Sequence, residues 1–508
     1  MTAPYPDTTR RRLISLATIL GTMMVALDGT IANVALTHIQ SSVSASSEQI
    51  VWVLTSYLIA AAIATPLTGW LADRVGRKKV MVASVIGFVI ASVACGGATN
   101  LEELVIFRML QGAFGASMIP LGQTVMLDIN PPERQGKAMA LYGMGSILGP
   151  VIGPTLGGYL TDSFNWRWVF LINLPIGIVA ATGMILFMSE TKTDKPTKFD
   201  LLGFTFLSVF IGAMQLLLDR GQQLDWFSSW EIRLEAIVMI LFGYLTVVQM
   251  FTARNSFVKP AILRDRNFIM GALISLVLGM IIYGVLALVS PMLQRLMGYP
   301  VMTTGIVTAP RGIGTIIAMM FVGQVINRVD PRALIMAGLS ISCISLFMMA
   351  HFSLEMGPWS IVTVGFIQGL GAGLVFVPTS TMVFATLDPA LRNEGSALYA
   401  LTRSLGASVA ISYLQALTIR NAGHVESRLV EGIRPDNPIM AMRLPDFDFN
   451  QPGMVSAVQH QIEQQAGMIG YLDSYWFLAI LTLISIPLAL FMRPSKNRGA
   501  GAPMVLAD

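Results

Sequence analysis

The stretch GWLADRVGRKK, residues 69–79, places five charged side chains between two long apolar runs. The runs cover about residues 51–71 and 80–97. Each therefore approaches the roughly 20 apolar residues that a helix needs to cross a bilayer. We interpret 69–79 as a short basic loop between two membrane-spanning helices.

The composition of the whole chain supports this interpretation. Of the 508 residues, 54% are hydrophobic and 12% are charged, and the mean hydropathy is +0.66. Soluble domains carry about 25% charged residues, so a polytopic membrane protein is expected. Apolar runs recur along the full length, which excludes a single signal peptide as their explanation. The pI of 9.1 does not indicate a nucleic-acid partner, because the basic residues are scattered between these runs.

The cysteines and histidines do not indicate a disulfide framework or a metal site. Cys95 and Cys343 both lie in apolar segments, where they are expected to be small core residues. The four histidines are widely dispersed, without metal-ligand spacing.

The apolar runs predict fourteen spanning helices arranged as six, two and six. We place them near residues 13–36, 51–71, 80–97, 101–124, 137–160, 166–187, 200–218, 232–252, 267–290, 303–327, 333–353, 359–383, 395–420 and 472–492. We divide the chain into an N-terminal six-helix bundle (1–190), two linker helices (191–262), a C-terminal six-helix bundle with an outer loop at 421–471 (263–495), and a tail (496–508).

The distribution of Lys and Arg predicts the orientation. With the N-terminus inside, the inner segments hold 22 of them and the outer segments 8, with three more inside helices. Because inner loops carry the excess of positive charge, both termini are expected to be cytoplasmic.

The two sets of six helices show weak internal similarity. The stretch RMLQGAFGASMIP (108–120) is echoed by GFIQGLGAGLVFVP (365–378), and YGMGSILG (142–149) by YALTRSLG (399–406). Related halves are typical of transporters whose site lies between the repeats.

Several residues of the basic loop have individual roles. Gly69 permits close helix approach, Asp73 can meet a neighbouring helix N-terminus, and Gly76 allows the sharp turn. Asp128, at the inner end of the fourth helix, is a candidate ion-pair partner for one of the bases. Those bases, which would anchor the loop at the inner leaflet, are Arg74, Arg77, Lys78 and Lys79. The alternative is a basic loop with no further role.

Asp28 is the only ionisable residue between Leu13 and Leu36. A charge at that depth costs about 2.5–3.5 kcal/mol on insertion scales and normally serves a function. Arg108 lies about two turns inside the fourth helix and is its natural partner, with Gln111 on the same helical face. Alternatively, Arg108 only bonds to backbone carbonyls and joins helices.

Two further bases lie inside helices of the second half. Arg311 and Arg403 have no acid within the apolar parts of the neighbouring helices. Three interpretations remain open, namely substrate anion binding, contact with carbonyls, or a position nearer the interface.

Residues 137–160 carry a stripe of glycines at every fourth position. A stripe of this kind lets two membrane helices touch backbone to backbone, and the two prolines beside it predict kinks or breaks. The residues are Gly145, Gly149, Pro150, Gly153, Pro154 and Gly157. The alternative is a packing face and no more.

These motifs together resemble one protein family. Residues 69–79 are similar to the signature loop of the major facilitator superfamily. Further stretches resemble motifs of the fourteen-helix drug:proton antiporter family within this superfamily. They are LDGTIANVAL (27–36), LVIFRMLQGAFGA (104–116) and LYGMGSILGPVIGPTLGG (141–158). Two more, WRWVFLINLPIG (166–177) and QQAGMIGYLDSYW (464–476), extend the resemblance to the EmrB-type exporters of that family. The resemblance covers essentially the whole chain. Thr37 departs from it, since proline usually follows NVAL there.

The resemblance implies an all-α major facilitator fold and proton-coupled efflux of hydrophobic or amphipathic compounds across the inner membrane, without a cofactor. It implies proton coupling by Asp28 and Arg108, and it makes the glycine stripe a seam against the second half. Tyr57 matches a family position that lines the cavity, and we add Gln111, Arg311 and Arg403 as tentative substrate contacts.

The outer loop is expected to hold an amphipathic helix that lies on the membrane surface or docks on the transporter. Its apolar positions are Val455, Val458, Ile462, Ala466 and Ile469. The resemblance makes this loop a candidate contact for a periplasmic adaptor that works with an outer-membrane channel. A lid or spacer without a partner is the alternative.

Other functions remain to be weighed. A dedicated exporter of one metabolite, such as a siderophore or a fatty acid, would use Arg311 and Arg403. An enzyme is disfavoured, because no paired carboxylates, histidine cluster or nucleophile motif is present. A sensor would require a sizeable cytoplasmic output domain.

Overall fold

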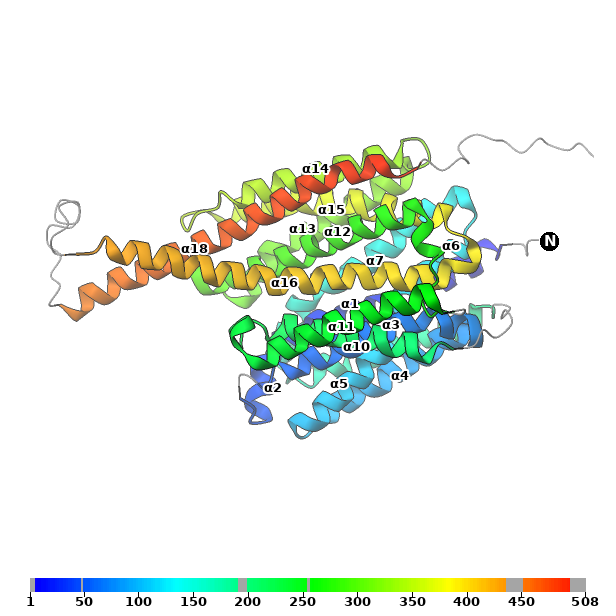
Figure 1. The fold of residues 1–508 in the computed structure, drawn as a ribbon, viewed down its shortest axis with the longest axis horizontal. Helices are drawn as coiled ribbons and strands as arrows, with labels where there is room; N and C mark the ends of the chain where they lie inside the picture. Colours follow the sequence, from blue (N-terminus) through cyan, green and yellow to red (C-terminus); the bar gives the residue numbers. More distant parts are fainter. Residues whose placement is uncertain (1–4, 47–48, 191–198, 254–255, 435–450, 494–508) are drawn as a thin grey trace, which may run out of the picture.

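The computed structural model describes residues 5–46, 49–190, 199–253, 256–434 and 451–493. In these ranges all regular structure is helical. The predicted tail and most of the proline-rich part of the outer loop lie outside the described residues. Figure 1 shows the helices running roughly along one direction as a bundle.

The first half contains six membrane-spanning segments, two of them divided into two helices. Its helices are α1 (Thr8–Val34), α2 (Leu36–Ser42), α3 (Trp52–Val75), α4 (Arg77–Gly97), α5 (Leu101–Gly115), α6 (Met118–Asp128), α7 (Pro132–Ser163), α8 (Trp168–Leu171) and α9 (Asn173–Phe187). Helix α1 packs against α7 and α9, α3 against α5, and α4 against α5 and α9.

The second half repeats this arrangement, and its last two spanning helices are the longest of the chain's described helices. The helices of this half are α12 (Arg266–Pro291), α13 (Val301–Val325), α14 (Pro331–Met349), α15 (Pro358–Thr386), α16 (Arg392–Glu431) and α18 (Pro452–Ser485), with short turns at η2 (Ile262–Arg264), η3 (Met292–Leu296), η4 (Pro389–Leu391) and η5 (Ile486–Phe491). Helix α15 packs against α13 and α14, and α12 packs against α16.

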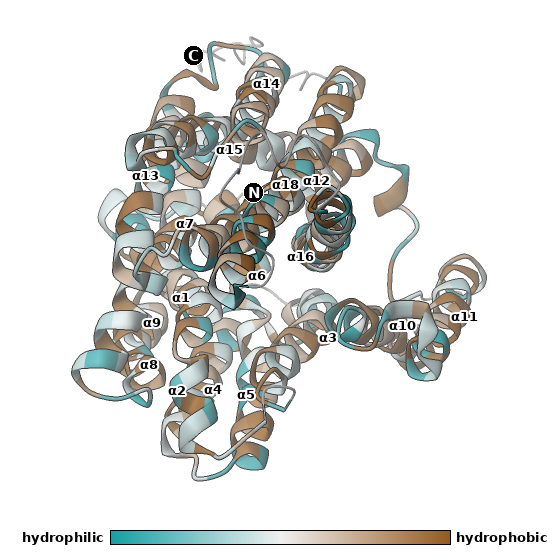
Figure 2. Ribbon diagram, turned by 90° about the vertical axis from the view of Figure 1, so that its left-hand side faces the viewer, coloured by the Kyte–Doolittle hydropathy of each residue, from teal (hydrophilic) through white to brown (hydrophobic). Residues whose placement is uncertain are grey.

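Two inserted helices lie beside the bundle. They are α10 (Leu201–Arg220) and α11 (Trp230–Thr252), joined through η1 (Trp226–Ser228), and Figure 2 shows α11 at the outer edge. Arg220 links them by pairing with Glu231 and Glu235 of α11. Most of α11 is exposed, as expected for a helix that faces lipid, while α10 contacts α3 and α16.

Thirteen described segments are long and apolar enough to cross a membrane. Helix α16 has the length to be the fourteenth, but Arg403 and several serines within its central part lower the hydropathy there. The chain is therefore a multi-pass membrane protein of about fourteen helices, as its apolar runs predict.

The outer loop differs from expectation. Helix α16 continues to Glu431 and α18 begins at Pro452, so the two helices extend past the bundle as an antiparallel pair (Figure 1). Thr418 contacts Ser474 at 2.8 Å, and Asn421 donates to Asp473 at 2.9 Å. Of the two predicted arrangements of this amphipathic helix, the one lying on the membrane surface is therefore wrong, and the one docked on the transporter agrees with the structure. The apolar spacing of this helix belongs to a continuation of the last spanning helix, which packs against α16.

The two halves meet mainly where α7 packs against α13 and α3 against α16, with smaller contacts of α6 with α16 and of α7 with α15. We call the end of the bundle at which the chain begins the N-terminal end, and the opposite end, where α16 and α18 project, the hairpin end. One apolar cluster includes residues from both halves, among them Tyr142, Met319 and Phe376.

Candidate functional site

Asp28 lies inside the first half with none of its surface exposed. Three side chains from two other helices surround its carboxylate. Arg108 Nη1 lies 2.6 Å from Oδ2, while Gln111 Nε2 and Asn173 Nδ2 donate to Oδ1 at 2.8 and 2.9 Å. Both carboxylate oxygens therefore have strong donors although no solvent reaches them.

Arg108 is held in several directions at once. Its Nε donates to the carbonyl of Val53 at 3.1 Å, and its Nη1 also donates to Gln111 Oε1 at 2.7 Å. The guanidinium carbon lies 4.2 Å from the ring centre of Tyr57 and 5.6 Å from that of Phe170. Arg108 thus contacts Asp28, its predicted partner, as well as a backbone carbonyl, so the alternative in which it bonds only to carbonyls is wrong.

Asn173 was missed as a site residue from the sequence. It opens α9, is fully buried, and donates to Ser92 Oγ at 3.0 Å as well as to Asp28. Ser92 in turn donates to the carbonyl of Phe170 at 2.8 Å. The sequence signal that could have identified it was an amide side chain within the otherwise apolar stretch WRWVFLINLPIG.

The energetics of this cluster make it sensitive to charge. A buried pair loses much of its Coulomb gain to desolvation, and removing one partner leaves an uncompensated ion that costs about 3–5 kcal/mol. A change in the charge of either partner therefore alters the energy of this packing. Such a change can bias one helix packing against another.

The tentative substrate residues fall into two groups. Gln111 and Tyr57 belong to the Asp28 cluster, with exposed fractions of 0% and 6%. In the second half, Arg311 Nη2 donates to the carbonyl of Ile282 at 2.6 Å. Arg403 lies with its guanidinium carbon 5.4 Å from the ring centre of Phe376. Neither arginine forms an ion pair within the described ranges, and neither joins the Asp28 cluster.

The basic loop forms contacts within its own half and across to the other half. Gly76 adopts φ +99° between α3 and α4, a conformation that favours glycine, so the turn takes a single residue. Arg77 pairs with Asp128, and Asp128 also accepts from Arg392 Nη1 of the second half at 3.2 Å. Arg74 stacks over Trp70.

The start of α16 completes this connection, which we call the N-terminal latch. Asn393 donates to Asp73, and a Cβ on Gly69 would lie 2.8 Å from the Cα of Glu394. Glu394 also pairs with Lys259 Nζ at 3.0 Å, which ties the segment after α11 to the same place. The latch thus consists of Gly69, Asp73, Arg77, Asp128, Lys259, Arg392, Asn393 and Glu394.

The glycine stripe of α7 faces a different neighbour from the predicted one. A Cβ on Gly149 would lie 2.6 Å from the backbone N of Leu27, and one on Gly157 would lie 2.8 Å from Ile31, both in α1. Gly145 and Gly153 also face α1, at Ile19 and Thr30.

The expected seam against the second half is therefore wrong for this stripe, which packs inside the first half. The opposite face of α7 meets α13, where Val151 and Thr155 lie against Gly312 and Gly305. Helix α7 runs from Pro132 to Ser163 without a break, so Pro150 and Pro154 do not interrupt it.

Comparisons with known proteins agree with this architecture. The family model described as the Major Facilitator Superfamily matches residues 18–411. The chain is 34% identical to the multidrug export protein EmrB of Escherichia coli K12 over 495 residues, 96% of each chain. It is 33% identical to the fatty acid resistance protein FarB of Neisseria gonorrhoeae, over 96% of this chain and 97% of that one.

A solved structure is similar in fold alone. The human organic anion transporter MFSD10 superposes with a TM-score of 0.61 at 12% identity, covering 95% of this chain and 100% of that one.

Proposed function

The chain belongs to the Major Facilitator Superfamily, and from that premise we propose that it is a proton-coupled exporter of hydrophobic or amphipathic toxic compounds. It is a transporter and not an enzyme. The proton gradient supplies the driving force, so the cycle needs no cofactor. The membrane potential adds about 2.3 kcal/mol per 100 mV for each charge moved.

The observation that carries the proposal is the buried ion pair of Asp28 and Arg108, linked to Gln111 and Asn173. When the outer side is open, Asp28 takes up a proton and substrate leaves. When the inner side is open, Asp28 loses the proton and substrate binds. Protonation neutralises one partner of the pair. That change in charge alters the free-energy difference between the inward-open and outward-open arrangements of the helices by several kcal/mol.

The orientation follows from the excess of Lys and Arg in the segments at the N-terminal end. We place this end and both termini on the cytoplasmic side of the inner membrane. The N-terminal latch then closes the cytoplasmic side, and the hairpin end faces the periplasm. Residues 1–190, 191–262 and 263–495 serve as first bundle, linker helices and second bundle.

The projecting pair α16–α18 is our candidate contact for a periplasmic adaptor that leads to an outer-membrane channel. The pair continues two spanning helices and is stabilised by contacts between Thr418 and Ser474 and between Asn421 and Asp473. A rigid projection of this kind offers a fixed surface, which a flexible loop would not.

A dedicated exporter of one acidic metabolite is the second candidate. It is favoured by the similarity to a fatty acid resistance protein and by Arg311 and Arg403, which have no acid partner in the described part of the chain. Competition of a long-chain fatty acid against a lipophilic cation in the assay below separates the two candidates.

The test uses proteoliposomes with an imposed pH gradient and a fluorescent lipophilic cation. We expect Asp28→Asn to bind the dye but to lose gradient-driven transport and the accompanying proton movement. Asparagine keeps the size of the side chain but exchanges one acceptor oxygen for a donor NH2, so it removes the negative charge together with the hydrogen bonds accepted by that oxygen. Retained dye binding separates a loss of coupling from a loss of the fold.

The matched control is Asp162→Asn, at an exposed position in the last turns of α7, which should transport like the wild type. If Asp28→Asn pumps as well as this control, the coupling acid lies elsewhere and the proposal fails.

A further inference from the structure

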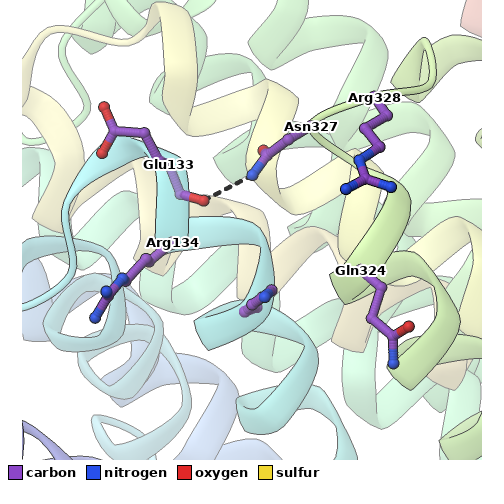
Figure 3. A pocket seen from close by; sticks show the side chains of 6 residues that line it. Glu133, Arg134, Gln324, Asn327 and Arg328 are labelled. Carbon is purple, nitrogen blue, oxygen red and sulfur yellow. Dashed lines mark hydrogen bonds between the residues drawn. The ribbon is translucent and has the colours of Figure 1, made fainter.

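A basic pocket opens at the N-terminal end, between the start of α7 and the end of α13. Its volume is about 520 Å³, and Figure 3 shows the two walls facing each other. One wall comes from the first half and the other from the second. The lining residues are Glu133, Arg134, Lys137, Gln324, Asn327 and Arg328.

The charge of this pocket is unbalanced. Arg134, Lys137 and Arg328 are exposed, and within the described residues none of them forms an ion pair. The one acid, Glu133, uses its backbone carbonyl to accept from Asn327 Nδ2 at 2.7 Å, and Figure 3 shows its carboxylate directed away from Arg328. The pocket is therefore lined by three cations, two amides and one acid, which gives it a net positive charge.

The neighbouring cations of the same end are satisfied differently. Arg77 and Arg392 share Asp128, and Lys259 pairs with Glu394. Lys78 donates to the carbonyl of Ile185 at 2.7 Å. The α7–α13 junction instead gathers in one pocket three cations without ion pairs to any described residue, and none of the latch residues lines it.

An apolar surface continues from the pocket toward the middle of the bundle. On α7, Leu141 lies one turn beyond Lys137 and is 47% exposed. On α13, Phe321 and Ile317 lie one and two turns before Gln324 and are 53% and 46% exposed. A molecule with an anionic headgroup and apolar chains would contact both the basic pocket and the apolar surface beside it. A soluble anion would contact the pocket alone.

We propose that the pocket binds the phosphate headgroup of an anionic phospholipid, with its acyl chains along Leu141, Phe321 and Ile317. This rests on the proposed orientation, which places the pocket at the inner leaflet. Basic pockets between membrane helices on that side favour such headgroups, and arginine can hold a phosphate with two hydrogen bonds.

The position of the pocket gives the lipid a consequence for transport. Its walls belong to different halves, and Asn327 and Glu133 already join them. A headgroup bound by Arg134 and Arg328 would add a charged bridge across the same junction. The lipid therefore stabilises the arrangement in which the two halves meet at the cytoplasmic side.

The experiment measures thermal unfolding of the purified full-length protein in a neutral detergent. Phosphatidylglycerol, phosphatidylcholine and glycerol 3-phosphate are titrated separately. We expect phosphatidylglycerol to raise the melting temperature saturably, and the other two to have little effect. The readout is independent of transport, so it stands apart from the proton-coupling test.

The test variant is Arg134→Gln/Arg328→Gln, which removes one cation from each wall. Each basic residue near an anionic lipid surface contributes about a fivefold factor, so half-saturation should shift by about 30-fold. Arg134→Lys/Arg328→Lys, which keeps the charge, should recover most of that shift.

The matched control, Arg11→Gln/Arg12→Gln, removes the same charge at the same end, away from the pocket. Equal stabilisation of the control and the test variant by phosphatidylglycerol would overturn the proposal, as would no stabilisation of the wild type. An equal effect of glycerol 3-phosphate would overturn the lipid in favour of a soluble anion.

Discussion

At the scale of single residues, the Asp28 carboxylate shows how a charge is kept inside a membrane protein. Each oxygen has at least one donor, and the donors come from α5 and α9, so the charge joins three helices. Asn173 and Gln111 are both neutral amides, and both donate to Oδ1 of Asp28 at nearly the same distance. Asn173 does so from the first position of its helix. Neutral amides therefore share with Arg108 the task of holding this side chain inside the bundle.

We predict that Asn173→Ala lowers the free energy of unfolding by about 1–3 kcal/mol, because a buried carboxylate oxygen loses a donor. Transport driven by a pH gradient should also fall. Thermal unfolding and the dye assay measure the two effects. Asn33→Ala is the control, since Asn33 is exposed on α1. Identical melting of the two variants would contradict the prediction.

The contact between Asp28 and Arg108 could be predicted because each is a lone charge in an apolar run. Charged side chains at that depth usually pair with one another. The contact of Asn173 with Asp28 could not be predicted in the same way. Amides occur at many helix ends without a partner of this kind, so residue type and position were insufficient.

At the scale of elements, the glycines of α7 show what a periodic pattern leaves undecided. Their spacing identifies one face of the helix and predicts a close contact, but it contains no information on which helix approaches. The structure places α1 there and gives the opposite face to α13. Likewise, the apolar spacing of residues 455–469 suits both a surface helix and the observed continuation of α18.

We predict opposite effects for two alanine substitutions in α7. Gly149→Ala should destabilise the protein by about 1–3 kcal/mol, because the added Cβ meets the backbone of Leu27, which cannot rotate away. Gly158→Ala should be neutral or stabilising by up to about 1 kcal/mol, because nothing lies within 4 Å and alanine favours the helix. Melting temperatures of both variants check this, and equal destabilisation would refute it.

At the scale of the whole molecule, the polar side-chain contacts between the halves lie at the N-terminal end, as far as the described residues show. Asp128 accepts from Arg77 of its own half and from Arg392 of the other, so one carboxylate serves both. The positions of the spanning helices could be predicted from hydropathy. The two ion pairs of Asp128 could not be predicted, because they depend on how the two halves pack, and the halves are distant in sequence.

We predict that Asp128→Asn shifts the population toward an open N-terminal end. The carboxylate is 31% exposed, so the loss should be about 1 kcal/mol, roughly a fivefold change in the equilibrium. Spin-label distances between positions 79 and 329 measure it, with Asp162→Asn as control. An unchanged distance distribution would contradict the assignment of Asp128 to the latch.

Helix α16 has a mechanical consequence, because it begins at the latch and ends in the projecting pair without interruption. Its 40 residues make a rod of about 60 Å, so a rocking of the second half by about 10° would sweep its far tip through about 10 Å. The tip therefore converts a small change at the latch into a much larger displacement at the hairpin end. A single fluorophore on the tip would report each rocking motion, and a protein bound there would be displaced with it.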